Sequence, residues 1–202
     1  METKEASRKP EPAHWPSFLR GGDASEILAH LSEGDPLRLQ ELSARRLREV
    51  WYLLEPERVY LRSLAVCAKA ASKEDPPQDL SAWKLAKVDL AIEQLVRKDH
   101  EAERAHPELV DEEEKVFPLL TDSLMLDPEL VRFASTSFNA LDALPRRAFF
   151  ELLIEGREVA DVVEAGPWDE DGLYEAIQTA LATVALDVPP EPPDDPGQGK
   201  KR

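Results

Sequence analysis

Apolar residues recur every three or four positions between Asp23 and Leu186, and this spacing constrains the fold more than any other feature of the chain. A repeat of this kind places apolar side chains along one face of an α-helix. No stretch alternates between apolar and polar residues over the length of a half-buried strand. The sequence therefore predicts an all-α fold.

Capping residues and prolines predict where the helices begin and end. Asp23 and Asp169 have the character of N-caps, and Gly34 that of a terminator. Pro36 and Pro56 suit the first turn of a helix. The predicted helices cover residues 24–33, 36–54, 56–74, 80–105, 128–144, 145–155, 158–165 and 169–186.

Composition divides the chain into two predicted helical domains joined by an acidic linker. The linker lies in a stretch from Asp99 to Glu129 that has eleven acids against Arg104 and Lys115. The last residues are rich in proline and acids and are typical of a disordered tail. We predict a flexible N-terminus over 1–22, a first domain over 23–105, the linker over 106–126, a second domain over 127–186 and a disordered tail over 187–202.

The overall charge narrows the set of partners. The formal net charge is −16 and the pI is about 4.7, so the average surface repels nucleic acid and anionic lipid. The single cysteine, Cys67, excludes an intramolecular disulfide framework, and its apolar helical stripe predicts a buried thiol. No apolar run approaches the roughly 18 residues of a membrane span, and the polar N-terminus has no signal-peptide core. We expect a cytoplasmic protein that does not enter a membrane.

One region combines the pattern of a DNA reader with the wrong charge. From Glu158 to Gly199 there is no lysine or arginine, while eleven acids fall in that stretch. Most of a predicted helix-turn-helix lies in this stretch, in which the run EGREVADVVEAG is followed directly by PWDEDGLYEAIQTALA. Helices that read DNA usually carry basic and amide side chains, because phosphate contacts supply much of the affinity.

Three stretches resemble the bacterial sigma factors of the extracytoplasmic-function type. ILAHLSEGDPLRLQEL is similar to the opening helix of that family. DLSAWKLAKVDLAIEQLVRK is similar to the helix that places a tryptophan ahead of the strand-separating residues. ALDALPRRAFFELLIEGREVADVVEAG is similar to the start of its C-terminal domain. The resemblance implies a region 2-like domain and a region 4-like helix-turn-helix domain, and it covers most of residues 24–185.

The chain departs from the family pattern in both domains. In the first domain, a family amide that faces a base is matched by Asp89, which offers only acceptors. In the final helix, the apolar positions Leu173, Ile177 and Ala180 remain, while three basic positions become Tyr174, Ala176 and Thr179. We interpret this segment as a degenerate recognition helix, whose candidate residues are Asp169, Glu170, Asp171, Tyr174, Glu175, Gln178 and Thr179.

Basic residues concentrate in the first domain. Residues 36–73 hold eight bases against four acids. In the family, this part of the domain docks on the polymerase, and a basic face suits an acidic partner. The alternative is a solvated surface with i,i+4 pairs such as Arg45–Glu49. The candidate contacts to nucleic acid or polymerase are Arg45, Arg46, Arg58, Arg62, Trp83, Lys84, Lys87, Arg97 and Lys98.

Motifs for catalysis or cofactor binding are missing from the sequence. The spacing from His100 to His106 with its intervening glutamates does not match a known zinc pattern, and we interpret it as a solvated charged stretch. No nucleophile elbow, phosphate loop or dinucleotide glycine pattern occurs. We therefore expect no enzymatic activity, no cofactor and no metal.

Three functions remain open. The first is a sigma-like protein that acts through contacts with RNA polymerase or an anti-sigma factor, with promoter reading weakened or lost. The second is a working sigma factor that directs polymerase to promoters mainly through its first domain. The third is an unrelated helical adaptor that shares only the packing of a helix-turn-helix.

Overall fold

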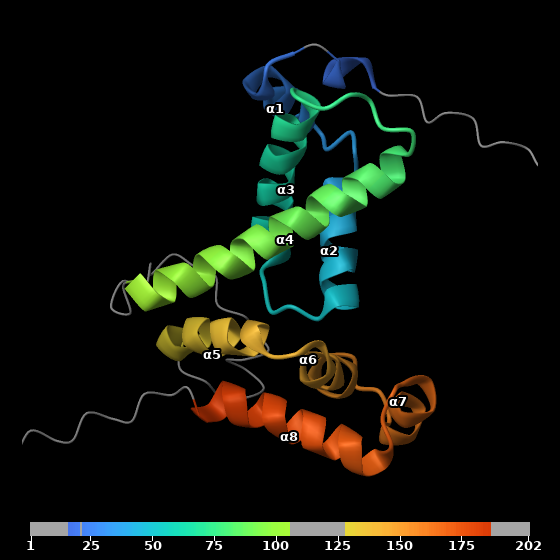
Figure 1. Cartoon of the computed structure of the whole chain (residues 1–202), viewed down its shortest axis with the longest axis vertical. Coiled ribbons are helices and arrows are strands. Elements are labelled where there is room, and N and C mark those ends of the chain that lie inside the picture. The colour runs from blue at the N-terminus through green and yellow to red at the C-terminus, as the bar shows by residue number, and fades with distance from the viewer. Residues whose placement is uncertain (1–15, 21, 106–127, 187–202) are drawn as a thin grey trace, which may run out of the picture. The chain divides into compact units, whose positions relative to one another are not determined.

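The computed structural model describes residues 16–20, 22–105 and 128–186, and every regular element in these ranges is helical. The prediction of an all-α fold is confirmed for this part of the chain (Figure 1). The chain divides into two compact units. Residues 1–49 and 54–98 form the N-terminal unit, and residues 50–53 join residues 99–202 in the C-terminal unit. The predicted linker, residues 106–126, the tail, residues 187–202, and most of the predicted flexible N-terminus lie outside the described residues.

The N-terminal unit is built from a short 3-10 turn and four helices. Its elements are η1 (Ser17–Leu19), α1 (Ala24–Ser32), α2 (Leu39–Val50), α3 (Pro56–Ala71) and α4 (Leu80–Ala105), the last of which belongs to this unit as far as Lys98. Helix α1 packs against α3. The fully buried side chains of the unit include Leu19, Ile27, Leu31, Leu39, Val59, Val88 and Ile92. Asp23 caps α1 as predicted, because its Oδ1 accepts hydrogen bonds from the amides of Ser25 and Glu26 at 2.8 and 2.9 Å.

Helix α2 is shorter than the sequence predicts at both ends. Asp35 caps it, since its two carboxylate oxygens accept hydrogen bonds from the amides of Leu39 and Gln40, each at 2.8 Å. The preceding turn places Arg38 at a φ of 55°, so a helix cannot run continuously from Pro36. Trp51 has a φ of 56° and stops the helix after Val50. The predicted extension to residue 54 is therefore wrong.

Helix α4 has the predicted bounds, but two of the apolar positions in its helical pattern, Ala86 and Leu90, are exposed. Leu90 is 39% exposed, whereas its neighbours Ala91 and Ile92 are buried. Its position on the helix faces away from the core.

The C-terminal unit consists of α5 (Pro128–Ala140), α6 (Ala143–Phe149), η3 (Phe150–Ile154), α7 (Val159–Ala165) and α8 (Glu170–Leu186). Helix α8 packs against α5, α6 and α7. The rings of Phe138 and Phe149 lie 4.8 Å apart at the centre of its core. The predicted helices over 128–144 and 145–155 have different bounds, because the chain turns after Ala140 and α6 already begins at Ala143. From Phe150 onward the turn widens into a π-helical one.

Residues 50–53 add an irregular segment to this core. Leu53 is buried with Phe138 and Phe149. The side chain of Asn139 accepts a hydrogen bond from the Leu53 amide at 2.8 Å and donates one to the Leu53 carbonyl at 3.0 Å. Both polar groups of that backbone are thereby satisfied in the interior.

Candidate functional site

The predicted helix-turn-helix lies in α7, the turn over residues 166–169 and α8. Asp169 caps α8, since its Oδ1 accepts a hydrogen bond from the Gly172 amide at 2.9 Å. Gly166 is required in the turn, because a Cβ at this position would lie 2.5 Å from the Trp168 ring and 2.7 Å from the Val162 carbonyl oxygen. The turn is therefore closely packed, and it fixes the direction in which α8 leaves α7.

The solvent face of α8 carries the predicted recognition-helix residues. Leu173, Ile177 and Ala180 are buried, as the sequence predicts for the apolar side of the helix. Tyr174 is 43% exposed. The other exposed candidate residues are Asp169, Glu170, Asp171, Glu175, Gln178 and Thr179. These side chains offer carboxylates, hydroxyls and one amide, but no cation.

One predicted departure from the family pattern does not concern this face. Ala176 was expected to replace a basic residue that contacts DNA, but it is 8% exposed and belongs to the core of the unit. A charged side chain at this position would point into the apolar interior. The face therefore differs from a basic recognition helix at Tyr174 and Thr179, and not at Ala176.

The acids beside this face have no counter-ion within the described residues. Asp161, Glu164 and Glu175 are exposed. The nearest arginine in the sequence, Arg157, directs its guanidinium to Glu151 at 2.8 Å instead. Its other amino group donates to the backbone carbonyl of Asp161, not to the carboxylate. The surface formed by α7, its turn and α8 is consequently negative without compensation.

An ionic cluster around the buried Glu151 packs beneath this surface, and the sequence analysis did not predict it. Glu151 is 5% exposed and accepts hydrogen bonds from Arg147 at 2.5 Å and from Arg157 at 2.8 Å. The Arg147 guanidinium lies 5.4 Å from the Trp51 ring and 5.1 Å from the Trp168 ring. These distances are those of cation–π contacts. The cluster connects residues 50–53, α6, the π-helical turn and the turn before α8.

Arg146 occupies a second buried position nearby. Its guanidinium carbon lies 3.7 Å from the centre of the Tyr52 ring, and its Nη1 donates to the Val50 carbonyl at 3.3 Å. The spacing of Arg147 and Glu151, four residues apart, is the only sequence signal for their pairing, and no local signal indicates the position of Arg146. Both arginines lie in the stretch ALDALPRRAFFELLIEGREVADVVEAG.

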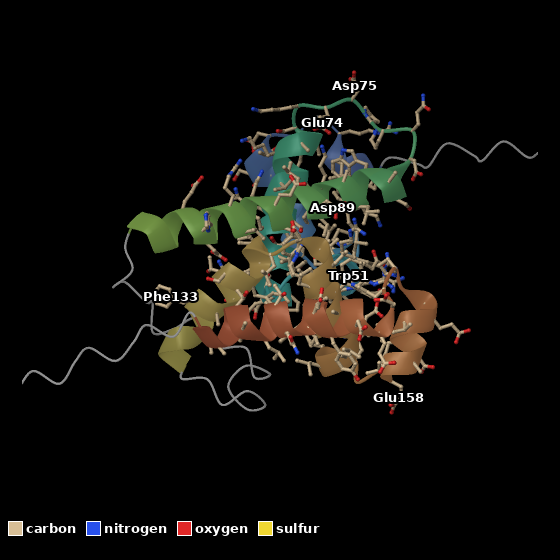
Figure 2. The ribbon with its side chains drawn as sticks, turned by 60° about the horizontal axis from the view of Figure 1, so that its bottom comes forward. Trp51, Glu74, Asp75, Asp89, Phe133 and Glu158 are labelled. Atoms are coloured by element: carbon tan, nitrogen blue, oxygen red, sulfur yellow. The ribbon has the colours of Figure 1, made fainter. Side chains whose placement is uncertain are left out.

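In the N-terminal unit, Asp89 has a structural partner. Asp89 lies on α4 (Figure 2). Its carboxylate accepts two hydrogen bonds from Arg46, from Nε at 2.6 Å and from Nη2 at 3.2 Å. Arg46 also pairs with Glu49 at 2.9 Å. The hydrogen bonding of Arg46 to the Asp89 carboxylate is the main cause of the raised pKa of Arg46. The pair ties α4 to α2.

Trp83 and Lys87 are also engaged within the fold. Trp83 is 8% exposed, and its Nε1 donates to Glu74 at 2.9 Å. Lys87 pairs with the other oxygen of Glu74 at 2.7 Å. The hydrogen bond from Lys87, followed by that from Trp83, lowers the pKa of Glu74. The tryptophan is therefore a packed residue whose indole N–H is already bonded.

The remaining candidate bases differ in how many of their polar groups are already bonded within the chain. Lys84 donates to the Leu37 carbonyl at 3.0 Å, and Arg62 donates from Nε to Gln94 at 2.9 Å. Arg45 lies 3.7 Å from Glu49, so the alternative of an exposed i,i+4 pair holds for this residue. Arg58 and Arg97 have interactions of their own within the fold, and Lys98 is exposed.

Other kinds of site are not found in the described part of the chain. It holds no group of three or more histidine, cysteine, aspartate or glutamate side chains placed to bind a metal ion. Among the same residues, no helix has the length and apolar character needed to cross a bilayer. Cys67 is buried as predicted, and burial raises its thiol pKa to about 12.

Comparison with protein-family models, curated proteins and solved structures finds no match to this chain. The functional interpretation therefore rests on the residues and contacts described above.

Proposed function

We propose that the chain is a sigma-factor-like transcription protein that acts through protein contacts, with promoter reading by its C-terminal helix pair weakened or lost. The observation that carries this proposal is the solvent face of α8. It stands on a packed helix–turn–helix scaffold, yet the chain has no lysine or arginine from Glu158 to Leu186.

Electrostatics supports a protein partner over DNA for this face. Each neutralised phosphate contributes strongly to affinity, and a face without cations neutralises none. Glu170, Asp171 and Glu175 add repulsion along the first turns of α8. The partial positive charge of the helix N-terminus is met by the helix's own acids. A basic protein surface is the complementary partner.

The N-terminal unit adds a different kind of support. Several bases that the resemblance would assign to polymerase or DNA are engaged within the fold, notably Arg46 with Asp89 and Lys87 with Glu74. The contact with Arg46 explains why position 89 is an aspartate, so this residue is not separate support for a lost contact to a DNA base. The proposal depends on α8 and on the resemblance of the chain to the family, which assigns RNA polymerase or an anti-sigma factor as the partner.

A binding experiment tests this function directly. The full chain is mixed with core RNA polymerase and, separately, with labelled duplex and single-stranded DNA at low and moderate salt. We expect the chain to co-purify with polymerase and to bind neither DNA detectably at moderate salt. Sequence-specific DNA binding by the chain alone, with a steep dependence on salt, would overturn the loss of promoter reading. Failure to bind polymerase or an anti-sigma factor would favour an unrelated helical adaptor.

The working sigma factor is the second candidate. The observation that favours it is the set of exposed cations on α3 and in the turn after it, which include Lys69 and Lys73. Transcription from a promoter library by polymerase with and without the chain distinguishes the two. New start sites that require the chain would support a promoter reader, and unchanged start sites would support the proposed protein-contact role.

A further inference from the structure

A groove of about 350 Å³ lies between α3 and α4 within the N-terminal unit. Its rim is basic, with Arg62, Lys69 and Lys73 from α3 and its C-terminal turn and Lys87 from α4. Glu74 is the only acid that lines it. In a chain with a net charge of −16, this is a local reversal of sign.

The cations on the rim are not equivalent. Glu74 neutralises Lys87 through the contact at 2.7 Å. Lys69 and Lys73 are exposed, and neither side chain forms an ion pair with another described residue. Arg62 donates a hydrogen bond to Gln94 from Nε only, and this bond holds the guanidinium between α3 and α4. The two terminal amino groups of Arg62 remain available to a carboxylate. Three cations therefore remain for a ligand.

The floor of the groove is apolar. Ala65, Val66 and Ala70 line it from α3, and Leu90 lines it from α4. Leu90 is 39% exposed, although its neighbours Ala91 and Ile92 are buried. A leucine held at a basic rim provides a contact for one apolar side chain of a ligand.

We propose that this groove binds an acidic amphipathic segment of a partner protein. The carboxylates of the segment contact Arg62, Lys69 and Lys73, and one of its apolar side chains packs on Leu90 and the small residues of the floor. This inference rests on the proposed protein-contact function and names the chemistry of its partner. A single-stranded nucleic acid fits less well, because no aromatic side chain lines the groove to stack on a base.

Defined peptides test the proposal on the full chain labelled with ¹⁵N. The first peptide is helical, with glutamates on one face and leucines spaced four residues apart. The second has glutamine in place of each glutamate, and the third has alanine in place of each leucine. Titration is followed by amide chemical shifts. We expect the first peptide to shift the amides of Lys69, Lys73 and Leu90, and to bind at least about tenfold more tightly than either of the other two.

Charge-reversal variants locate the binding. Lys69→Glu combined with Lys73→Glu should weaken binding of the first peptide by about tenfold or more. The matched control is Arg20→Glu combined with Arg48→Glu, which makes the same change in net charge at exposed positions outside the groove. It should change the affinity by less than about twofold. Leu90→Ala should weaken binding while leaving its salt dependence unchanged. Circular dichroism verifies that each variant is folded.

Several results would overturn the inference. One is equal affinity of the groove variant and the matched control for the first peptide. Another is the absence of any shift with any peptide. A third is an oligo-dT that shifts the same amides at lower concentration than the acidic peptide. Polymerase binding is measured with the same groove variant as a separate readout. If the variant keeps polymerase while peptide binding proves insensitive to the groove, the proposed function stands and the groove assignment alone falls.

Discussion

Two groups of acids in this chain look alike in the sequence but have different surroundings. Asp89 and Glu151 are each held by arginines, Asp89 by Arg46 and Glu151 by Arg147 and Arg157. Glu164 and Glu175, on α7 and α8, form no ion pair within the described residues. A carboxylate with a built partner stabilises the fold, while one without a partner shapes the surface field. The meaning of an acidic position therefore depends on whether a cation has been placed beside it.

The difference also explains where function is expected. In the C-terminal unit, both arginines of α6 and the arginine before α7 point into the cluster around Glu151 and the neighbouring aromatic rings. These three arginines are thereby directed away from the face of α8. The negative surface results both from the acids it carries and from this inward direction of the arginines. A variant that disturbs the cluster should thus differ sharply from one that disturbs the face.

The largest expected effect is the loss of the buried carboxylate. Glu151→Ala leaves Arg147 and Arg157 without their partner in the interior, and we expect a loss of about 3 kcal/mol in the free energy of unfolding. Urea denaturation followed by circular dichroism measures it. The matched control is Glu175→Ala on the exposed face of α8, with an expected change within about 0.5 kcal/mol. Similar values for the two variants would show that the distinction between paired and unpaired acids is wrong.

Cations restored to α8 should produce the next largest effect. The triple variant Tyr174→Lys, Gln178→Arg and Thr179→Arg places three positive charges on exposed positions of a packed helix. We expect its affinity for duplex DNA at low salt to rise by about thirtyfold, with a steeper dependence on salt. Fluorescence anisotropy of a labelled duplex measures both.

The control for this variant places the same charges elsewhere. Ser81→Lys, Ala82→Arg and Ala86→Arg change three exposed positions of α4. If the control gains as much affinity as the α8 variant, the effect is one of net charge, and α8 has no special geometry for DNA. If the α8 variant is folded and gains nothing, the alignment with a recognition helix is wrong.

A smaller effect is expected for the pair that ties α2 to α4. Arg46 and Asp89 are half-buried and doubly hydrogen-bonded, but their side chains remain 25% and 33% exposed. A double-mutant cycle with Arg46→Gln and Asp89→Asn should give a coupling of about 1 kcal/mol in the free energy of unfolding. A coupling near zero would show that the ion pair with Arg46 does not stabilise the fold, and Asp89 would then behave like the unpaired acids of α7 and α8. Asp89→Asn should leave DNA binding unchanged, because the side chain faces Arg46.

Local sequence signals predicted much of the fold, but they predicted little about which acids are paired with arginines and which are not. The caps at Asp23 and Asp169 and the proline at the start of α3 act within a few residues, so the sequence states them directly. The buried apolar side of α8 follows from its spacing in the same way. The partner of Asp89 does not follow from local spacing, because its contact with Arg46 spans 43 residues and depends on how helices cross. Both arginine partners of Glu151 lie within six residues of it, but their spacing does not show that the carboxylate is buried.

The early end of α2 has the same origin. Residues 51–54 continue an apolar helical pattern, and nothing local predicts that Trp51 leaves it. The competing interaction is distant, since Asn139 bonds both backbone groups of Leu53 across 86 residues. The exposure of Leu90 could not be predicted from local sequence either. The apolar stripe of α4 is wider than the surface that packs on the core, so Leu90 lies at the groove instead.

The smallest effect near neutral pH is expected from the titration of Cys67, a group without any ionic partner in the core. Burial raises its thiol pKa from 9.0 to about 12, so the folded state holds the proton more tightly than the unfolded one. Its contribution to stability is therefore complete below pH 9 and declines as the pH rises from about 9 to 12. At pH 8 we expect a thiol reagent such as DTNB to react at the rate of unfolding, and Cys67→Ala to remove the thiol-dependent part of the decline above pH 9. Rapid labelling of the folded chain at pH 8 would contradict the buried position of the sulfur, and would place this residue, like the acids of α8, on an accessible surface.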